Sequence, residues 1–271
     1  MIDFFFDTAD DVYVRQLWEK IKGQVDPINV RGITTNPNAF KKMDMFSLSE
    51  WESQLVKLCQ VVSDIRGDDL GVVYVQAPVT TMTPDEVLDW VKYISKFNDG
   101  NTKLALKIPP YKPILEVVEN INEYMEVNVT GVADCSTALC CFSYPVRYVS
   151  IIPGRMEENG IDAKSHVAFA NQRKSNNQEI ITGSMRTVDG LTWVSEYGTV
   201  PTIGSRVWDL IFTEMGVEEF ADLKYKDQDS WIKFSPHISD TNTKLSVDFF
   251  EQMDECGKIC ATEFRSLMVT K

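Results

Sequence analysis

Residues 71–77, Gly-Val-Val-Tyr-Val-Gln-Ala, and residues 103–108, Lys-Leu-Ala-Leu-Lys-Ile, are two short apolar runs with a helical pattern between them. That helical segment opens with Thr-Pro-Asp-Glu at residues 83–86, which supplies an N-cap threonine, a first-turn proline and the glutamate of a capping box. Apolar runs rich in valine, leucine and isoleucine are typical of strands that are buried on both faces. The stretch therefore predicts a strand, a helix and a second, parallel strand.

The same alternation extends in both directions along the chain. The predicted strands are Ile2–Phe6, Ile28–Thr34, Gly71–Ala77, Lys103–Ile108, Val127–Val132, Tyr148–Ile152, Glu179–Gly183 and Val200–Ile203. Amphipathic segments separate them, such as Asp10–Ile21, whose predicted apolar side includes Val12 and Leu17. Eight strand–helix units need about 250 residues, and the chain has 271. We therefore predict an α/β fold, a single (β/α)8 TIM barrel, over residues 1–215.

The strand pattern stops after residue 215. A long helix is predicted over Leu245–Met268, with its apolar side formed by Phe249, Phe250, Met253, Ile259 and Phe264. We expect residues 216–271 to form a C-terminal helical extension that packs on the barrel or on a neighbouring subunit. A homo-oligomer is the expected assembly.

The charge balance narrows the choice of partners. The net charge is −13, with 27 basic and 40 acidic residues. An acidic surface repels nucleic-acid phosphates and anionic lipids, so we expect neither nucleic acid nor membrane as a partner. An anionic substrate would need a local cluster of arginine or lysine, which makes the placement of individual arginines informative.

Cysteine and histidine spacing gives no sign of a metal site. The six cysteines form no CxxC pair and the two histidines are isolated, so we expect no metal, no cofactor, and free buried thiols in a reducing compartment.

Residues 1–7 lack the basic start and apolar run of a signal peptide, and no run approaches the about 20 apolar residues of a membrane helix. The sequence thus favours a cytoplasmic protein.

In such barrels the reactive groups gather at the carboxyl ends of the strands. The polar residues expected there are Asp7, Thr34, Asn36, Gln76, Lys107, Thr130, Ser150, Arg155, Ser184 and Arg186. This set contains one lysine, one carboxylate, several hydroxyl and amide groups, and two arginines. It lacks the second carboxylate of a glycosidase, the histidine of a hydrolase triad and the ligands of a metal hydrolase.

Lys107 lies within the apolar run Leu-Ala-Leu-Lys-Ile-Pro at residues 104–109. A buried cation is costly unless it is paired or loses its proton. A free lysine has a pKa of about 10.4, whereas a nucleophilic amine works best at about 7 to 8. Two interpretations fit the lysine's context: its head reaches water or pairs with Asp7, or it is a desolvated nucleophile.

Several segments together resemble the transaldolase and fructose-6-phosphate aldolase family. They are FFFDTA at residues 4–9, GITTNP at 32–37, LKIP at 106–109, VNVT at 127–130, YVS at 148–150 with GR at 154–155, GSMR at 183–186, and TI at 202–203. Each motif is weak alone, but they occur in the family's order from about residue 2 to residue 215. The resemblance implies a TIM barrel whose members form a Schiff base with a sugar phosphate.

The resemblance also implies a role for each matching residue. Lys107 matches the lysine that attacks the ketone, and Asp7 matches the carboxylate that exchanges a proton with the C4 hydroxyl. Gln76 and Thr130 match the pair that positions a water during imine formation. The matching substrate-binding residues are Thr34 and Asn36 for the dihydroxyacetone portion, and Ser150, Arg155, Ser184 and Arg186 on the two phosphate-binding segments.

Some positions depart from the usual transaldolase pattern. Gln76 stands where transaldolases carry a glutamate and the direct aldolases a glutamine, whereas Ile152 replaces the phenylalanine of the former and the tyrosine of the latter. The loss of that tyrosine hydroxyl counts against a direct aldolase. We therefore expect a transferase that moves dihydroxyacetone units between sugar phosphates. Two alternatives remain: a lyase that releases free dihydroxyacetone from fructose 6-phosphate, and a barrel that binds sugar phosphates without turnover.

Overall fold

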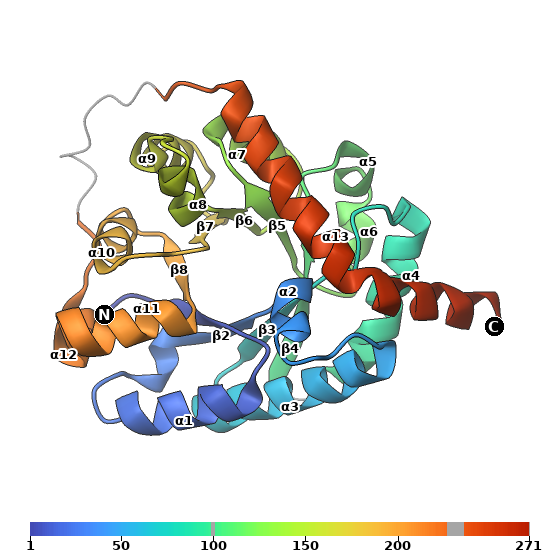
Figure 1. Cartoon of the computed structure of the whole chain (residues 1–271), viewed down its shortest axis with the longest axis horizontal. Helices are drawn as coiled ribbons and strands as arrows, with labels where there is room; N and C mark the ends of the chain where they lie inside the picture. Colours follow the sequence, from blue (N-terminus) through green and yellow to red (C-terminus); the bar gives the residue numbers. More distant parts are fainter. Residues whose placement is uncertain (99–100, 227–235, 271) are drawn as a thin grey trace.

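The structure, a computed structural model, describes residues 1–98, 101–226 and 236–270. Eight parallel strands close into a barrel in chain order (Figure 1). They are β1 (Phe4–Asp7), β2 (Val30–Thr34), β3 (Gly71–Gln76), β4 (Thr102–Ile108), β5 (Val127–Val132), β6 (Tyr148–Ile151), β7 (Glu179–Thr182) and β8 (Val200–Ile203). The predicted TIM barrel is confirmed.

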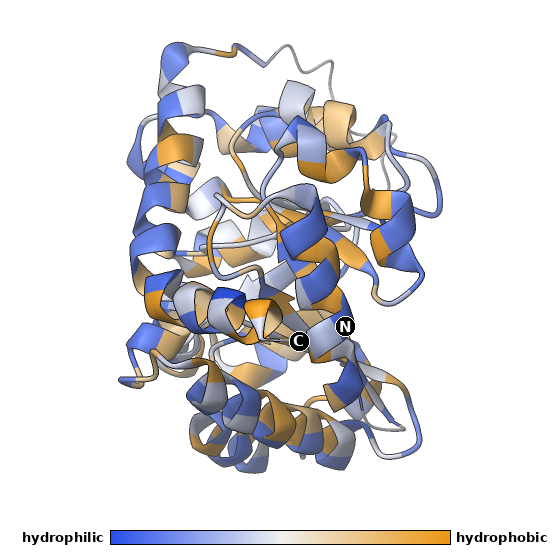
Figure 2. Ribbon diagram, turned by 90° about the vertical axis from the view of Figure 1, so that its right-hand side faces the viewer, coloured by the Kyte–Doolittle hydropathy of each residue, from blue (hydrophilic) through white to orange (hydrophobic). Residues whose placement is uncertain are grey.

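Helices surround the barrel and follow the strands in sequence. They are α1 (Asp11–Ile21), α2 (Pro37–Lys41), α3 (Leu48–Arg66), α4 (Pro84–Ile94), α5 (Lys112–Leu115), α6 (Val118–Asn122), α7 (Cys135–Phe142), α8 (Pro153–Glu158), α9 (Ala163–Asn171), α10 (Val188–Glu196), α11 (Ser205–Leu210), α12 (Val217–Asp222) and α13 (Asp240–Val269). The helices carry hydrophobic residues on one side and hydrophilic residues on the other (Figure 2). Across the described ranges, no helix has both the length and the hydrophobicity that crossing a bilayer requires.

Local signals fix several helix ends. Both hydrogen bonds of the predicted capping box at α4 are present: the Glu86 backbone donates to Thr83 Oγ1 at 3.2 Å, and the Thr83 backbone donates to Glu86 Oε2 at 2.8 Å. The second strand begins at Val30 and not at Ile28 as predicted, because Asp26 caps a 3-10 turn over Pro27–Asn29. The first strand likewise runs from Phe4 to Asp7, not from Ile2 to Phe6, so that its carboxylate pairs in register with β2.

Three predicted burial positions are wrong. Val12 is 56% exposed, because α1 buries Val14, Leu17 and Ile21 at helical spacing and Val12 lies off that stripe. On α13, Ile259 is 51% exposed, since the buried stripe passes through the neighbouring residue 260. Cys140 is exposed on α7, whereas the other five cysteines are buried as predicted.

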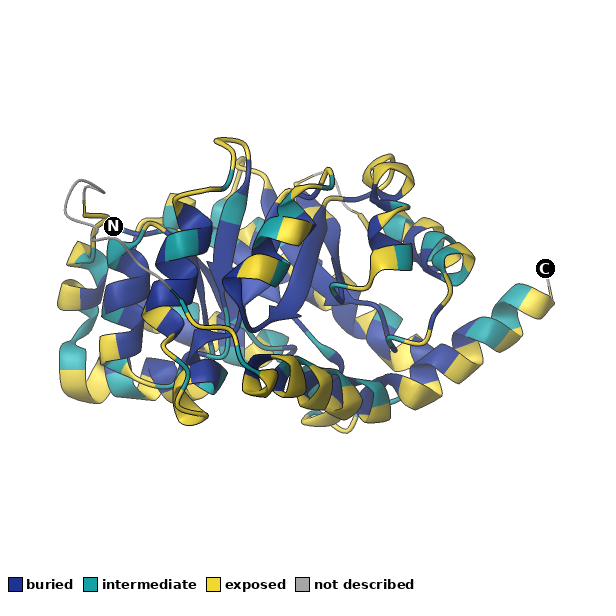
Figure 3. Ribbon diagram, turned by 90° about the horizontal axis from the view of Figure 1, so that it is seen from above, coloured by how far each residue is buried: buried dark blue, intermediate teal, exposed yellow. Residues whose placement is uncertain are grey.

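Helix α13 lies along one side of the barrel's carboxyl end and extends beyond it at the C-terminus (Figures 1 and 3). It starts at Asp240, earlier than predicted. Asp254 accepts hydrogen bonds from Thr80 N at 2.7 Å and Thr80 Oγ1 at 2.6 Å, which ties the helix to the segment after β3. A Cβ at Gly257 would lie 1.8 Å from the Pro78 carbonyl oxygen. The absence of a side chain at position 257 therefore permits this close approach.

Candidate active site

The interior of the barrel is divided into an apolar layer and a polar layer. The apolar layer is built from inward-facing side chains in the middle of the strands: Phe5, Tyr74, Ala105, Tyr148, Ile181 and Val200. The rings of Phe5 and Tyr74 meet edge to face at 5.4 Å between centroids, and those of Tyr74 and Tyr148 do so at 5.8 Å. Two positions further along β1, β3 and β4 stand Asp7, Gln76 and Lys107, on the same face because side chains alternate along a strand.

Lys107 is 6% exposed and lies among neighbouring strands in a defined register. It is aligned with Gln76 on β3 and with Asn128 on β5. Its Nζ donates to the backbone oxygen of Thr35 at 3.0 Å. Burial lowers the pKa of Lys107, and the negative charge of Asp7 opposes that shift. The head of Lys107 therefore does not reach water. The alternative of pairing with Asp7 stays open, because Asp7 attracts its charge, and the burial also fits a desolvated nucleophile.

The carboxylate of Asp7 is held by a neutral neighbour. Thr34 Oγ1 donates to Asp7 Oδ1 at 3.1 Å, and the two residues pair in register between β1 and β2. Asn36 follows β2 and caps α2, because its Oδ1 accepts from the backbone nitrogen of Ala39 at 2.9 Å. Capping uses the side-chain oxygen of Asn36 and fixes the amide group, whose two N–H donors suit hydroxyl or carbonyl oxygens of a ligand.

Two buried amides beside Lys107 are only partly satisfied. Within the described structure, Gln76 Oε1 and Asn128 Nδ2 have no hydrogen-bond partner. The other end of the Asn128 amide accepts from Ser150 Oγ at 2.9 Å, which orients it. A buried polar group without a partner costs about 1–3 kcal/mol. One open acceptor and one open donor on the strands flanking the amine thus suit a water molecule or a polar ligand.

Asn128 is a polar residue beside Lys107 that was not predicted as part of the candidate site. It is fully buried on β5. The signal was present in the sequence, since Asn128 and Thr130 alternate on one strand and share a face. Thr130 itself is 3% exposed at the end of β5. The next residue, Gly131, has φ of +73° and lies under Phe249 and Phe250 of α13.

The two predicted phosphate-binding segments are in contact. A Cβ on Gly154 would lie 1.8 Å from the backbone oxygen of Ser184, so glycine permits their approach. Ser184 adopts a positive φ of 56°, a conformation uncommon outside glycine and turns. Burial and the nearby charge of Arg186 lower the pKa of Arg155. Two cations at the ends of β6 and β7 form a candidate anion site in an otherwise acidic protein.

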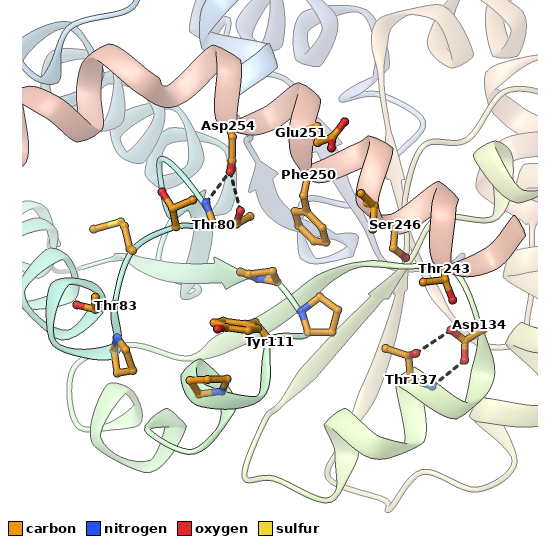
Figure 4. Close-up of a pocket in the computed structure, with 17 residues that line it drawn as sticks. Thr80, Thr83, Tyr111, Asp134, Thr137, Thr243, Ser246, Phe250, Glu251 and Asp254 are labelled. Carbon is orange, nitrogen blue, oxygen red and sulfur yellow. Dashed lines mark hydrogen bonds between the residues drawn. The ribbon is translucent and has the colours of Figure 1, made fainter. Parts of the chain in front are cut away.

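A cavity of about 700 Å³ lies beside this region, between α13 and the segments after β3, β4 and β5 (Figure 4). None of the predicted site residues lines it. Its ionisable lining includes the carboxylates of Asp134, Glu251 and Asp254 and no lysine or arginine, so its charge does not suit a phosphate. Phe250 points into it from α13. This cavity is therefore separate from the lysine and the arginines.

The thiols and the acidic groups give no metal centre in the part of the chain that the structure describes. No group of three or more histidine, cysteine, aspartate or glutamate residues there is arranged to hold a metal ion. Burial raises the pKa of Cys141 to about 12. A thiol that keeps its proton is a poor nucleophile and a poor ligand.

Known proteins similar to this chain are named as probable transaldolases. No protein-family model matches the chain. A protein named "Probable transaldolase 2" from Bacillus anthracis is 27% identical over 229 residues, which cover 80% of this chain and 95% of that protein. A "Probable transaldolase" from Streptococcus pyogenes serotype M1 is 26% identical over 199 residues, covering 72% and 82% of the two chains.

Solved structures agree with the fold. The carboxyl transferase domain of Rhizobium etli pyruvate carboxylase, determined with pyruvate, superposes with a TM-score of 0.51 at 8% identity. The match covers 94% of this chain and 48% of that one. At such low identity the likeness concerns the barrel fold alone.

Proposed function

We propose that the chain, which is related to proteins named "Probable transaldolase", is an enzyme that transfers a dihydroxyacetone unit between sugar phosphates. The donor is a ketose phosphate such as sedoheptulose 7-phosphate or fructose 6-phosphate, and the acceptor is an aldose phosphate. The observation that carries the proposal is the amine of Lys107. It is buried, it donates a hydrogen bond to a backbone carbonyl oxygen, and it lies in one polar layer with Asp7 and Gln76.

The first step is formation of a Schiff base. Burial favours the neutral amine of Lys107, whose lone pair attacks the C2 ketone of the donor. One proton moves from the nitrogen to the former ketone oxygen, which gives a neutral carbinolamine. A protonated imine then forms as the hydroxyl group leaves as water, once a second proton reaches it from solvent through a bound water molecule. The open acceptor of Gln76 and the hydroxyl of Thr130 are suited to position that water. Glutamine can orient this water but cannot itself donate or accept a proton, so the proton must pass through the water and not through Gln76.

The second step breaks the C3–C4 bond of the donor. Asp7 takes the proton of the C4 hydroxyl, the C3–C4 electron pair moves toward the iminium nitrogen, and an aldose phosphate leaves as the aldehyde. The remaining three carbons stay on Lys107 as an enamine. The acceptor aldehyde then forms the new bond as Asp7 returns the proton. Thr34 keeps the carboxylate oriented without neutralising it.

The two arginines supply the binding energy for the phosphate end of the substrate. Arg155 and Arg186 bring positive charge to the mouth of a protein whose net charge is −13. Guanidinium groups bind phosphate oxygens through paired, charge-assisted hydrogen bonds. This local reversal of charge suits phosphorylated donors and acceptors better than neutral sugars.

A lyase is the second candidate, and Gln76 is the observation that favours it, because the direct aldolases carry glutamine at this position. The two reactions differ in whether an aldose or a proton captures the enamine. Release of free dihydroxyacetone from fructose 6-phosphate should be measured without an acceptor. Release as fast as transfer would replace the transferase with the lyase.

Borohydride trapping tests the central step. The protein is incubated with fructose 6-phosphate, reduced, digested and analysed by mass spectrometry, and we expect one adduct on Lys107. Lys103, on the same face of β4 near the amino end of the barrel, is the matched control. Lys107→Ala should abolish the adduct, and Lys103→Ala should retain it. Absence of an adduct on the wild-type protein would favour a barrel that binds sugar phosphates without turnover.

A further inference from the structure

The two guanidinium groups at the mouth of the barrel are held in different ways. Arg186 donates from Nε to Oε1 of Glu158 at 2.9 Å, so a carboxylate partly compensates its charge. Arg155 donates from Nη2 to Oε1 of Gln252 at 3.0 Å. Its Cζ also lies 5.0 Å from the ring centroid of Phe249. Gln252 and Phe249 both belong to α13, so the C-terminal helix reaches the candidate anion site.

The partners of Arg155 on α13 are uncharged. An amide oxygen fixes the direction of a guanidinium, and an aromatic ring attracts it through its quadrupole, but neither cancels its charge. A carboxylate in place of Gln252 would bind more strongly and also neutralise the cation. Arg155 Nε is buried and has no hydrogen-bond partner within the described structure. The group is thus oriented and keeps its positive charge, which the nearby carboxylate of Glu158 favours, and its buried Nε donor is unsatisfied.

Helix α13 is anchored to the barrel on both sides of Gln252. Before it in sequence, Ser246 Oγ donates to the backbone oxygen of Gly131 at 2.8 Å. After it, Asp254 accepts two hydrogen bonds from Thr80. Phe249 is 6% exposed and lies against Gly131, the residue of β5 that follows Thr130. The helix therefore presents Gln252 from a fixed support.

We propose that Gln252 and Phe249 are positioning residues, which hold Arg155 in the orientation that binds the phosphate end of the substrate and add no negative charge beside it. The identity of that anion as a sugar phosphate rests on the proposed function. The contact itself requires no turnover, so inorganic phosphate is a sufficient probe. The proposal makes α13 part of the binding site and not only a cover for the barrel.

The experiment measures the affinity for inorganic phosphate by calorimetry on the full chain. Gln252→Leu removes the acceptor at similar size and should weaken binding roughly 3- to 10-fold, the effect of one lost hydrogen bond. Gln252→Glu should also weaken binding, although it holds Arg155 more tightly and leaves the melting temperature unchanged or raised. Phe249→Leu should weaken binding by a smaller factor. In steady-state assays, the Gln252 variants should raise KM for phosphorylated donors and leave kcat unchanged.

Thr80→Val is the matched control, since it removes one hydrogen bond between α13 and the barrel without touching Arg155. It should lower the melting temperature and leave phosphate affinity unchanged. Wild-type affinity in Gln252→Glu, or an equal loss in Thr80→Val and Gln252→Leu, would overturn the proposal. An adduct on Lys107 with no effect of Gln252 refutes this inference alone. Phosphate binding that depends on Gln252, without any adduct, refutes only the catalytic proposal.

Discussion

The two ends of the barrel interior carry similar residues in opposite circumstances. Asp3 and Asp7 stand four positions apart at the start and end of the first strand region, as do Lys103 and Lys107 on β4. At the amino end Asp3 pairs with Arg31 at 2.6 Å, and Lys103 is exposed beside a cavity of about 780 Å³. At the carboxyl end Asp7 has a threonine hydroxyl and Lys107 a backbone carbonyl as partner.

The difference shows which charges are used for stability and which are kept available. Opposite charges compensate each other at the amino end, where Arg147 also pairs with Glu179 at 3.0 Å. At the carboxyl end the hydrogen-bond partners of Asp7 and Lys107 are neutral, and the two groups attract each other without a direct ion pair, although burial makes an incompletely compensated charge costly. Such an arrangement is typical of a site that is selected for reactivity. Each prediction below therefore pairs a change at the carboxyl end with its counterpart at the amino end.

The largest contrast is expected between the two aspartates. Asp7→Asn should lower kcat/KM for transfer from fructose 6-phosphate to erythrose 4-phosphate by roughly 10²- to 10⁴-fold, because an amide cannot accept the C4 hydroxyl proton. Asp3→Asn should keep kcat/KM within about twofold and cost up to about 1 kcal/mol of stability, as for a partly exposed ion pair. Equal losses of activity in both variants would contradict the assignment of Asp7.

The arginines should differ by a smaller factor. Arg186→Ala should raise KM for a phosphorylated donor roughly 10- to 100-fold, the range for lost charged hydrogen bonds, and change KM for free dihydroxyacetone little. Arg147→Ala removes a guanidinium from the amino end and should leave both KM values unchanged. Kinetics with the two donors side by side provide the measurement. Equal effects of Arg186→Ala on both donors would show that the anion site lies elsewhere.

The smallest contrast concerns stability and its dependence on pH. Burial lowers the pKa of Lys107, so between that value and the about 10.4 of the unfolded chain the unfolded state binds more protons. Wild-type stability should therefore rise with pH across this window. Lys107→Met should be more stable than wild type at pH 7 by about 1–3 kcal/mol, and the gap should narrow as the pH rises.

Urea unfolding at a series of pH values measures this effect. Lys103→Met is the control and should change the free energy of unfolding by less than about 0.5 kcal/mol, since its side chain is exposed. A Lys107→Met variant that is less stable than wild type at pH 7 would mean that the folded state gains from the charge at this position.

The sequence predicted the barrel because strand patterning is local and repeats eight times. The same patterning placed Asp7, Gln76 and Lys107 at strand ends, and closure of the sheet brings them into one layer. Their catalytic roles stay predictions. Strand starts were harder to predict, because an apolar residue such as Ile28 can belong to a capped turn as well as to a strand.

Features that depend on contacts between residues far apart in the sequence could not be predicted from it. Asn128 was visible as a buried polar strand residue, but only the register places it beside Lys107. The contact between Arg155 and Gln252 joins residues 97 positions apart, and no local pattern encodes it. Even the side of α13 that faces the barrel was only partly predicted, as Ile259 shows.

The apolar layer around Tyr74 fills the barrel interior below the polar layer. Phe5, Tyr74 and Tyr148 in this layer are buried and meet edge to face, so we infer that a ligand reaches Lys107 from the opening at the carboxyl end of the barrel. If dihydroxyacetone is transferred there, the departing aldose must vacate the opening before the incoming aldose can enter. The first aldose therefore leaves before the second one binds, and the enamine on Lys107 must persist during this exchange. Double-reciprocal plots of rate against donor at several acceptor concentrations should accordingly be parallel.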